Sequence, residues 1–105
     1  MICYCYFEII MNFDNMDDLR KEIDLLDEEL LLLFKKRFNF IEQAAFIKDD
    51  INKIIDEDRI EFIINRVRAM AAENNVSEDI VESLWRYIID LSIKHEKEVF
   101  INSKK

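Results

Sequence analysis

The 105-residue chain contains neither glycine nor proline. Glycine makes up about 7% and proline about 5% of an average protein, so their joint absence constrains the fold more than any motif does. Tight β-hairpins and left-handed turn positions depend on these two residues. Long helices joined by few loops are the natural consequence, and the chain length favours one domain. The sequence therefore predicts an all-α fold.

Composition and charge narrow the classes of function. Half of the residues are hydrophobic and 36% are charged, which is typical of a folded globular protein rather than of a disordered chain. The formal net charge of −8 argues against nucleic acid as a partner, since such binders carry a basic face. A small anionic substrate stays compatible with this charge, provided that a few cations gather in one pocket.

Residues 1–16 differ in character from the rest of the chain. Residues 2–11 (ICYCYFEIIM) are apolar, but this stretch is too short to span a bilayer, and neither a basic stretch nor a small-residue cleavage site marks a signal peptide. Cys3 and Cys5 are too close together in one short segment to favour a mutual disulfide, and no zinc-binding pattern accompanies them. We therefore expect a poorly ordered or strand-like extension over 1–16, a functional domain over 17–105, no membrane association and a cytoplasmic protein.

The longest predicted helix runs from about Asp17 to about Lys48. Asn15 or Asp17 can cap its first turn, where acids also suit the helix dipole. A helix of about 30 residues is about 45 Å long and extends beyond a globule of this size, whose own core is thin. We therefore expect an intertwined homodimer in which two long helices share a core. Apolar residues recur along the helix at the heptad-like spacing of a buried seam: Leu19, Ile23, Leu26, Leu30, Leu33, Ile41 and Ala44.

Two shorter helices follow a weak stretch at residues 49–56, which we expect to be a loop or a broken turn. The second helix opens with acids at 56–58 and ends at Asn74 and Asn75, because asparagine is the best substitute for glycine at a left-handed C-cap. Ser77 is a suitable N-cap for the third helix. The apolar faces of the two helices are formed by Ile60, Ile63, Ile64, Val67, Met70 and Ala71, and by Val81, Leu84, Trp85, Ile88, Ser92 and Val99.

Two cations interrupt the seam of the long helix. Arg37 and Lys48 continue the seam beyond Leu33 and are 11 residues apart, so they point the same way, about 16 Å apart along the axis. A buried cation without a partner is very costly. Either each cation pairs with an acid, or Lys48 lies past the helix end, or the two belong to an anion-binding site in the core.

The third helix has a matching interruption at Ser92 and Glu96, which follow Ile88 on the same stripe. A serine in a core helix often bonds to its own backbone. A buried glutamate is more informative: it either pairs with Lys48 or lies where the seam turns to solvent. His95 is expected to be a solvated surface residue, because the chain has no second histidine to share a metal.

Arg20 completes this set of polar residues. It lies 17 residues before Arg37, about 25 Å away along the helix, and cannot reach a small ligand held by Arg37 of the same chain. If two long helices pair antiparallel, Arg20 of one chain lies beside Arg37 of the other, and two equivalent sites form by symmetry.

These residues resemble the helical chorismate mutase family, over about residues 17–101. The resemblance rests on 19–24 (LRKEID), 26–30 (LDEEL), 36–37 (KR) and Lys48 in the first helix, 56–59 (DEDR) in the second, and 84–92 (LWRYIIDLS) followed by Glu96 in the third. Each motif alone is short. The joint spacing is more specific and involves Arg20, Arg37, Lys48, Arg59, Ser92 and Glu96.

The resemblance implies an isomerase of the shikimate pathway that rearranges the dianion chorismate to prephenate in aromatic amino-acid biosynthesis, without a metal or an organic cofactor. It implies that Arg37, and Arg20 of the partner chain, clamp the two carboxylates, since the planar arginine fork binds a carboxylate bidentately. Such a Claisen rearrangement needs no nucleophile. It needs the reactive conformer to be held and the developing negative charge to be stabilised. In the implied site, Lys48 and Glu96 face the ether oxygen whose bond breaks, and the ring hydroxyl and a carboxylate are oriented by Asp56, Arg59 and Ser92.

Two positions depart from the family pattern. Members often have glutamine in place of Glu96, and an ionised Glu96 repels the developing charge, so Glu96 must be protonated to help. Burial favours that form and Lys48 opposes it, and we expect activity to rise below neutral pH. Mutases also commonly have a glutamate directly after Arg59, where it holds the substrate hydroxyl. This chain has Ile60 there, and Glu61 points about 100° away.

The isoleucine at position 60 is also typical of a sister family, the isochorismate-pyruvate lyases of salicylate synthesis. These enzymes share the fold and tend to be apolar at this position. Residues 70–75 (MAAENN) and the loop length between Lys48 and Arg59 also resemble the lyases, but lyases have glutamine in place of Glu96. Mutase activity is the preferred interpretation. The lyase and a non-catalytic helical dimerisation module are the alternatives, and a purely structural seam has no use for cations on its buried face.

Overall fold

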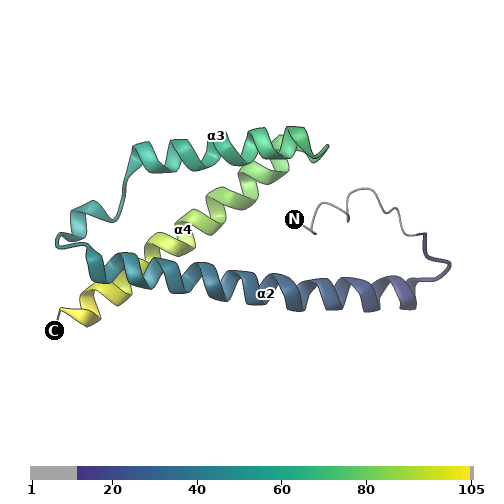
Figure 1. Ribbon diagram of the computed structural model, residues 1–105, viewed down its shortest axis with the longest axis horizontal. Helices are drawn as coiled ribbons and strands as arrows, with labels where there is room; N and C mark the ends of the chain where they lie inside the picture. The colour runs from purple at the N-terminus through teal and green to yellow at the C-terminus, as the bar shows by residue number, and fades with distance from the viewer. Residues whose placement is uncertain (1–11, 105) are drawn as a thin grey trace. The chain divides into compact units, whose positions relative to one another are not determined.

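The computed structural model describes residues 12–104, and these residues form helices and no strand. In chain order, the elements are α2 (Met16–Ile47), the 3₁₀ turn η2 (Ile51–Lys53), α3 (Glu57–Glu73) and α4 (Glu78–Ser103) (Figure 1). The predicted all-α fold of one long and two shorter helices is confirmed. The expectations for Cys3, Cys5 and most of the N-terminal extension fall on residues 1–11, outside the described part of the chain.

Short polar side chains set the helix ends. The Asn15 side-chain carbonyl accepts a hydrogen bond from the Asp18 amide at 2.9 Å, so Asn15 caps α2. Helix α2 ends at Ile47, although the Lys48 amide still donates to the Ala44 carbonyl at 3.0 Å. Lys48 therefore lies just past the helix end, which is one of the three alternatives that the sequence left open. The weak stretch after it contains η2, whose N-cap Asp50 accepts from the Asn52 amide.

The ends of α3 and α4 follow the sequence-based predictions closely. Asp56 caps α3 by accepting from the Arg59 amide at 3.0 Å, and Ser77 caps α4 by accepting from the Ile80 amide at 3.3 Å. Asn74 ends α3, and the backbone of Asn75 has φ 58°. Asparagine tolerates this left-handed conformation better than most residues do, which explains how a chain without glycine makes this turn.

The described chain divides into two compact units, one ending at Lys35 and the other beginning at Lys36, so α2 contributes to both. Among residues 12–35 of the first unit, no side chain is buried. The exposed fractions of four residues of the predicted seam lie between 41% and 63%: Ile23, Leu26, Leu30 and Leu33. A single chain therefore leaves this apolar seam uncovered.

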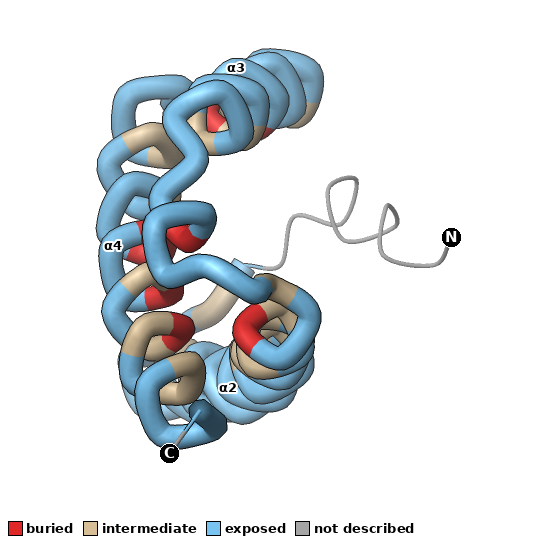
Figure 2. The backbone as a smooth tube through the Cα atoms, turned by 90° about the vertical axis from the view of Figure 1, so that its left-hand side faces the viewer, coloured by how far each residue is buried: buried red, intermediate tan, exposed pale blue. Residues whose placement is uncertain are grey.

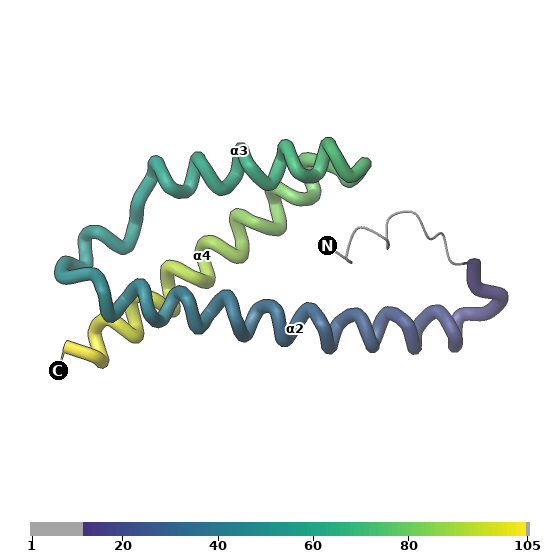
Figure 3. Tube along the Cα trace, in the orientation of Figure 1, coloured from purple at the N-terminus to yellow at the C-terminus, as the bar shows by residue number. Residues whose placement is uncertain are grey.

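The second unit contains the core, which lies mainly between α3 and α4 (Figures 1 and 2). The last turns of α2 cross the C-terminal half of α4 (Figure 3). Ala45 is fully buried, and its small side chain suits a close approach of helices. The buried residues of this unit are Ala45, Ile54, Ile64, Val67, Ala71, Ile88, Ile89, Ser92 and Glu96.

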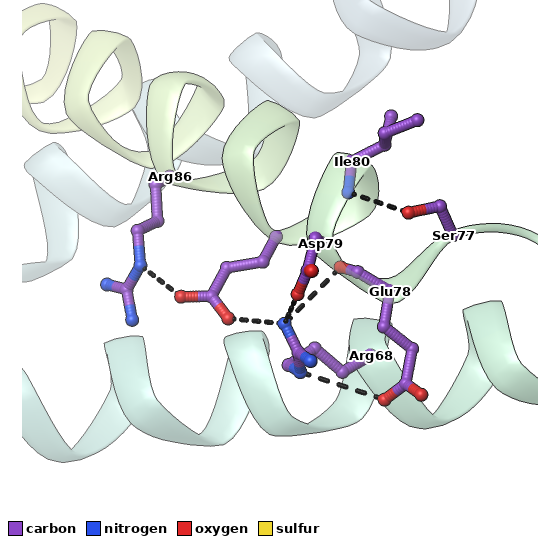
Figure 4. A network of polar contacts seen from close by, with 7 residues as sticks. Arg68, Ser77, Glu78, Asp79, Ile80 and Arg86 are labelled. Atoms are coloured by element: carbon purple, nitrogen blue, oxygen red, sulfur yellow. Dashed lines mark hydrogen bonds and ion pairs between the residues drawn. The ribbon is translucent and has the colours of Figure 1, made fainter.

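An ion-pair network, here called the Arg68 cluster, joins α3 to α4 near their connecting turn (Figure 4). The Arg68 guanidinium contacts the Glu82 carboxylate at 2.7 Å and the Asp79 carboxylate at 3.2 Å. Glu82 also accepts from Arg86 at 2.7 Å, and Glu78 lies 3.7 Å from Arg68. Every cation of this cluster therefore has an acidic partner.

No helix in the described part of the chain is long and apolar enough to cross a membrane.

Candidate active site

A cavity of ≈ 280 Å³ lies in the second unit, between the end of α2, the start of α3 and the C-terminal half of α4. Six of the seven site residues predicted from the sequence line it: Arg37, Lys48, Asp56, Arg59, Ser92 and Glu96. The seventh, Arg20, is exposed and belongs to the first unit. The chain thus gathers three cations and two acids around one cavity, from the three helices and from the segment between α2 and α3.

The Lys48 ammonium donates to the Glu96 carboxylate at 2.7 Å. The Glu96 side chain is only 6% exposed and the Lys48 side chain 28% exposed. The Lys48–Glu96 pair that the sequence left open as one alternative is therefore present, and the paired ammonium also lines the cavity. A substrate oxygen that approaches Lys48 must share or replace the Glu96 carboxylate as its partner.

Arg37 enters the cavity from α2 and is held there by α4. Its guanidinium donates to the Ser92 hydroxyl at 2.5 Å, and that hydroxyl in turn donates to the Ile88 carbonyl at 2.7 Å. Ser92 therefore bonds to its own backbone, as a core serine often does, and also fixes the arginine. Burial lowers the pKa of the Arg37 guanidinium, and the nearby positive charge of Arg59 lowers it further.

Arg59 and Asp56 lie at the start of α3. The Asp56 side chain is occupied as the helix cap, bound to the Arg59 amide, so it fixes the helix start that carries Arg59. The Arg59 guanidinium lies over the Phe62 ring, 5.1 Å from the centroid. Among residues 12–104, no carboxylate lies within ion-pair distance of Arg37 or Arg59.

The rest of the cavity wall is apolar and consists mostly of isoleucine. Ile60 faces the cavity, whereas Glu61 is not among its lining residues, as the helical rotation between neighbours predicts. The sequence did not single out Ile54, Ile89 or Ile93 as wall residues. Ile89 and Ile93 lie within one helical turn of Ser92. Their closeness to this predicted site residue is the signal by which the sequence could have identified them. Ile54 is buried in the loop after η2, where no periodicity exists to reveal it.

His95 differs from its prediction as a solvated surface residue. Its side chain is 35% exposed, and Nε2 lies 3.1 Å from the Glu42 carboxylate. It does not line the cavity. The arrangement around the cavity can hold an anion with more than one negatively charged group and can stabilise charge on an oxygen near Lys48, because clustered cations between apolar walls act strongly where water is excluded.

Comparison with known proteins agrees with this geometry. Residues 19–97 match the family described as chorismate mutase type II. The chain is 30% identical over 78 residues to a chorismate mutase of Methanocaldococcus jannaschii, an alignment that covers 73% of this chain and 79% of that protein. The chain belongs to the chorismate mutase type II family. It is also 32% identical over 84 residues to the T-protein of Haemophilus influenzae, covering 79% of this chain but 22% of that longer protein.

Family membership confirms the preferred interpretation of the sequence, a helical enzyme of the chorismate mutase class. The matched segment begins at residue 19 and ends at residue 97, so it contains every residue of the predicted site, from Arg20 to Glu96. These matches give no support to the lyase or to the non-catalytic alternative.

Proposed function

We propose that the chain rearranges chorismate to prephenate in the cavity at the α2–α4 crossing, with the residues that line it as the catalytic groups and with a second copy of the chain completing each site. The observation that carries this proposal is the placement of Arg37, Lys48 and Arg59 around one cavity with isoleucine walls. Three cations around so small a space suit a compact dianion.

Arg37, and Arg20 of the second chain, clamp the two carboxylates of the substrate, and Arg59 helps to orient a carboxylate. Among the described residues, neither Arg37 nor Arg59 has an acidic partner, and the guanidinium fork matches a carboxylate in geometry. Burial lowers the pKa of Arg37, and repulsion by Arg59 lowers it further; a bound dianion offsets that repulsion. The hydrogen bond that Arg37 donates to the Ser92 hydroxyl keeps its guanidinium fork in place. Asp56 acts on substrate orientation through the helix start that it caps.

Lys48 donates to the ether oxygen as its carbon–oxygen bond breaks. Negative charge grows on that oxygen in the transition state, so a fixed ammonium lowers the barrier. Glu96 lies beside Lys48, with 2.7 Å between the carboxylate and the ammonium, and faces the same ether oxygen. It lowers the barrier only when it is protonated, since it then donates a hydrogen bond to the oxygen rather than repelling its charge. The reaction is intramolecular, and holding the reactive conformer between the cations and the isoleucine walls supplies the rest of the acceleration.

The homodimer follows from the uncovered seam and from Arg20. Leucines of the first unit are strongly exposed in the single chain, with Leu30 at 41% and Leu33 at 63%, and large exposed apolar patches mark interaction surfaces. A second copy packed antiparallel along this seam covers the leucines and carries its Arg20 to Arg37 of the first chain. Each site then takes residues from both chains.

Mixing two inactive variants tests this sharing of sites. Arg20→Ala and Arg37→Ala each remove a residue from every site of their own homodimer. A mixed dimer of the two contains one site with both arginines and one site with neither. After unfolding and refolding an equimolar mixture, we expect about a quarter of the wild-type prephenate formation to return.

A matched control keeps the result specific. Arg37 and Lys48 are supplied to a site by the same chain, so in a mixed dimer of Arg37→Ala with Lys48→Ala one site lacks Arg37 and the other lacks Lys48. No activity should therefore return. Recovery in the control, or none in the Arg20 and Arg37 mixture of proven dimeric mass, contradicts the shared site.

A further inference from the structure

We propose that His95 and Glu42 form a positioning pair that sets the distance between Lys48 and Glu96. The two residues line no part of the cavity, and no step of the proposed reaction uses them. Their effect on catalysis rests on the function proposed above, whereas their effect on the Lys48–Glu96 contact can be measured without any substrate.

In the described part of the chain, three polar side-chain contacts join the end of α2 to α4. Arg37 bonds to Ser92, Glu42 to His95 and Lys48 to Glu96. The first and the third are cavity residues, while the second lies between them along α2. Substrate binding must disturb the first and third contacts, because the substrate competes for Arg37 and Lys48. The Glu42–His95 contact is the one that stays intact while the cavity fills.

His95 is held on two sides. Nε2 lies 3.1 Å from the Glu42 carboxylate, and the imidazole meets the Phe38 ring edge-on, with the ring centroids 5.7 Å apart and the planes at 78°. Phe38 and Glu42 are four residues apart on α2, so they share one helix face. An ionised carboxylate only accepts hydrogen bonds, so Nε2 carries the proton in this contact.

His95 directly precedes Glu96 on α4. Neighbouring side chains of a helix differ by about 100° around its axis, so fixing His95 against Glu42 also fixes the rotation of α4 that presents Glu96 to Lys48. The Glu96 side chain is 6% exposed and has little room to compensate for a rotated helix. Loss of the pair should therefore lengthen the Lys48–Glu96 contact and misplace both groups against the ether oxygen.

Steady-state kinetics of the full chain with chorismate test the catalytic consequence. We expect His95→Ala and Glu42→Ala each to lower kcat roughly tenfold, since a misplacement near 1 Å costs that much or more. KM should stay within about twofold of wild type, because the carboxylate ligands are untouched. The double variant should be no slower than either single variant, as expected for two halves of one interaction.

Two further variants separate positioning from general loss of stability. His95→Gln keeps an N–H donor for Glu42 and should retain most of the wild-type kcat. Arg86→Ala breaks an ion pair within α4, in which Arg86 lies 2.7 Å from Glu82. This pair lies outside the α2–α4 crossing, so the substitution should leave kcat unchanged. Equal losses in His95→Ala and Arg86→Ala, multiplicative losses in the double variant, or full activity in both single variants would overturn the proposal.

Proton exchange of the Lys48 ammonium, measured by ¹⁵N NMR without substrate, tests whether the Glu42–His95 pair holds the Lys48–Glu96 contact. This test is independent of catalysis. We expect exchange at least about fivefold faster in Glu42→Ala than in wild type or in Arg86→Ala, because hydrogen-bonded protons exchange slowly. An unchanged rate in Glu42→Ala refutes the positioning pair. Faster exchange in a protein that does not convert chorismate would uphold the pair and reject the proposed function instead.

Discussion

Two groups of arginines in the second unit have opposite surroundings. In the Arg68 cluster, Arg68 and Arg86 are bound to acids, with Glu82 within 2.7 Å of both (Figure 4). At the cavity, Arg37 has a serine hydroxyl as its partner and Arg59 lies over an aromatic ring. The pKa values follow this contrast, because the hydrogen bonds that Arg68 donates to Glu82 and Asp79 raise its pKa, while burial and Arg59 lower the pKa of Arg37.

The contrast distinguishes arginines that are bound to acids within the fold from the arginines that we propose bind the substrate. A chain with an excess of acids over bases, 23 to 15, has carboxylates available for every cation. Keeping acids away from Arg37 and Arg59 leaves like charges close together, which disfavours the folded state. Such an arrangement persists where an anionic ligand relieves it, so the cavity cations are expected to matter for activity and the Arg68 cluster for stability.

The largest expected effect is on activity at the cavity. Arg37→Ala should lower kcat/KM for chorismate by about 10²- to 10³-fold, the range for losing a charged group fixed at a developing charge or a carboxylate. The midpoint of thermal unfolding should stay unchanged or rise, because the substitution removes the repulsion with Arg59. Kinetics and thermal denaturation of the same preparation check both parts. A large fall in stability together with activity would instead make Arg37 a structural residue.

Glu96→Gln tests how a negative charge next to Lys48 affects the rate of the reaction. The Glu96 carboxylate lies 2.7 Å from the Lys48 ammonium, and an ionised carboxylate repels the charge that develops on the ether oxygen. The amide of glutamine donates to that oxygen instead, so Glu96→Gln should raise kcat several-fold at pH 8. The measurement is kcat of both proteins at this pH. An unchanged or lower kcat in Glu96→Gln would show that the charge of Glu96 does not limit the reaction.

The smallest effects are expected at the Arg68 cluster. Arg68→Ala should lower the unfolding midpoint by at most about 4 °C, since exposed ion pairs contribute little, and should leave kcat unchanged. Hydrogen bonds from Arg86 and Arg68 lower the pKa of Glu82. The resulting stabilisation is therefore present above the unfolded-state value of about 4.3 and is lost as pH falls through the lower folded-state pKa.

Thermal denaturation of wild type and Arg68→Ala from pH 3 to 7 checks this sign. The difference between their midpoints should be full at pH 7 and should shrink toward pH 3. A difference that grows as the pH falls would contradict the assignment of the stabilisation to the Glu82 carboxylate.

Much of the fold was predictable because local chemistry determines it. The caps at Asn15, Asp56 and Ser77 follow from side chains that accept backbone hydrogen bonds, and Asn75 supplies the left-handed turn. Four polar site residues were found because they interrupt apolar stripes: Arg37, Lys48, Ser92 and Glu96. Asp56 and Arg59 were implied only by the resemblance to the family.

Other features depend on how helices cross, which no single-helix pattern reveals. They include the cavity wall at Ile93, the hydrogen bond that Arg37 donates to Ser92 and the contact of His95 with Glu42.

The most direct measurement is the conversion of chorismate and, separately, of isochorismate by purified wild-type protein, Arg37→Ala, Lys48→Ala and Arg68→Ala. We expect prephenate from chorismate with wild type and Arg68→Ala, and a loss of at least about a hundredfold with Arg37→Ala and Lys48→Ala. Salicylate and pyruvate from isochorismate with little prephenate, or prephenate formation that survives both cavity substitutions, would contradict the assignment of the cavity at the α2–α4 crossing as a chorismate mutase active site.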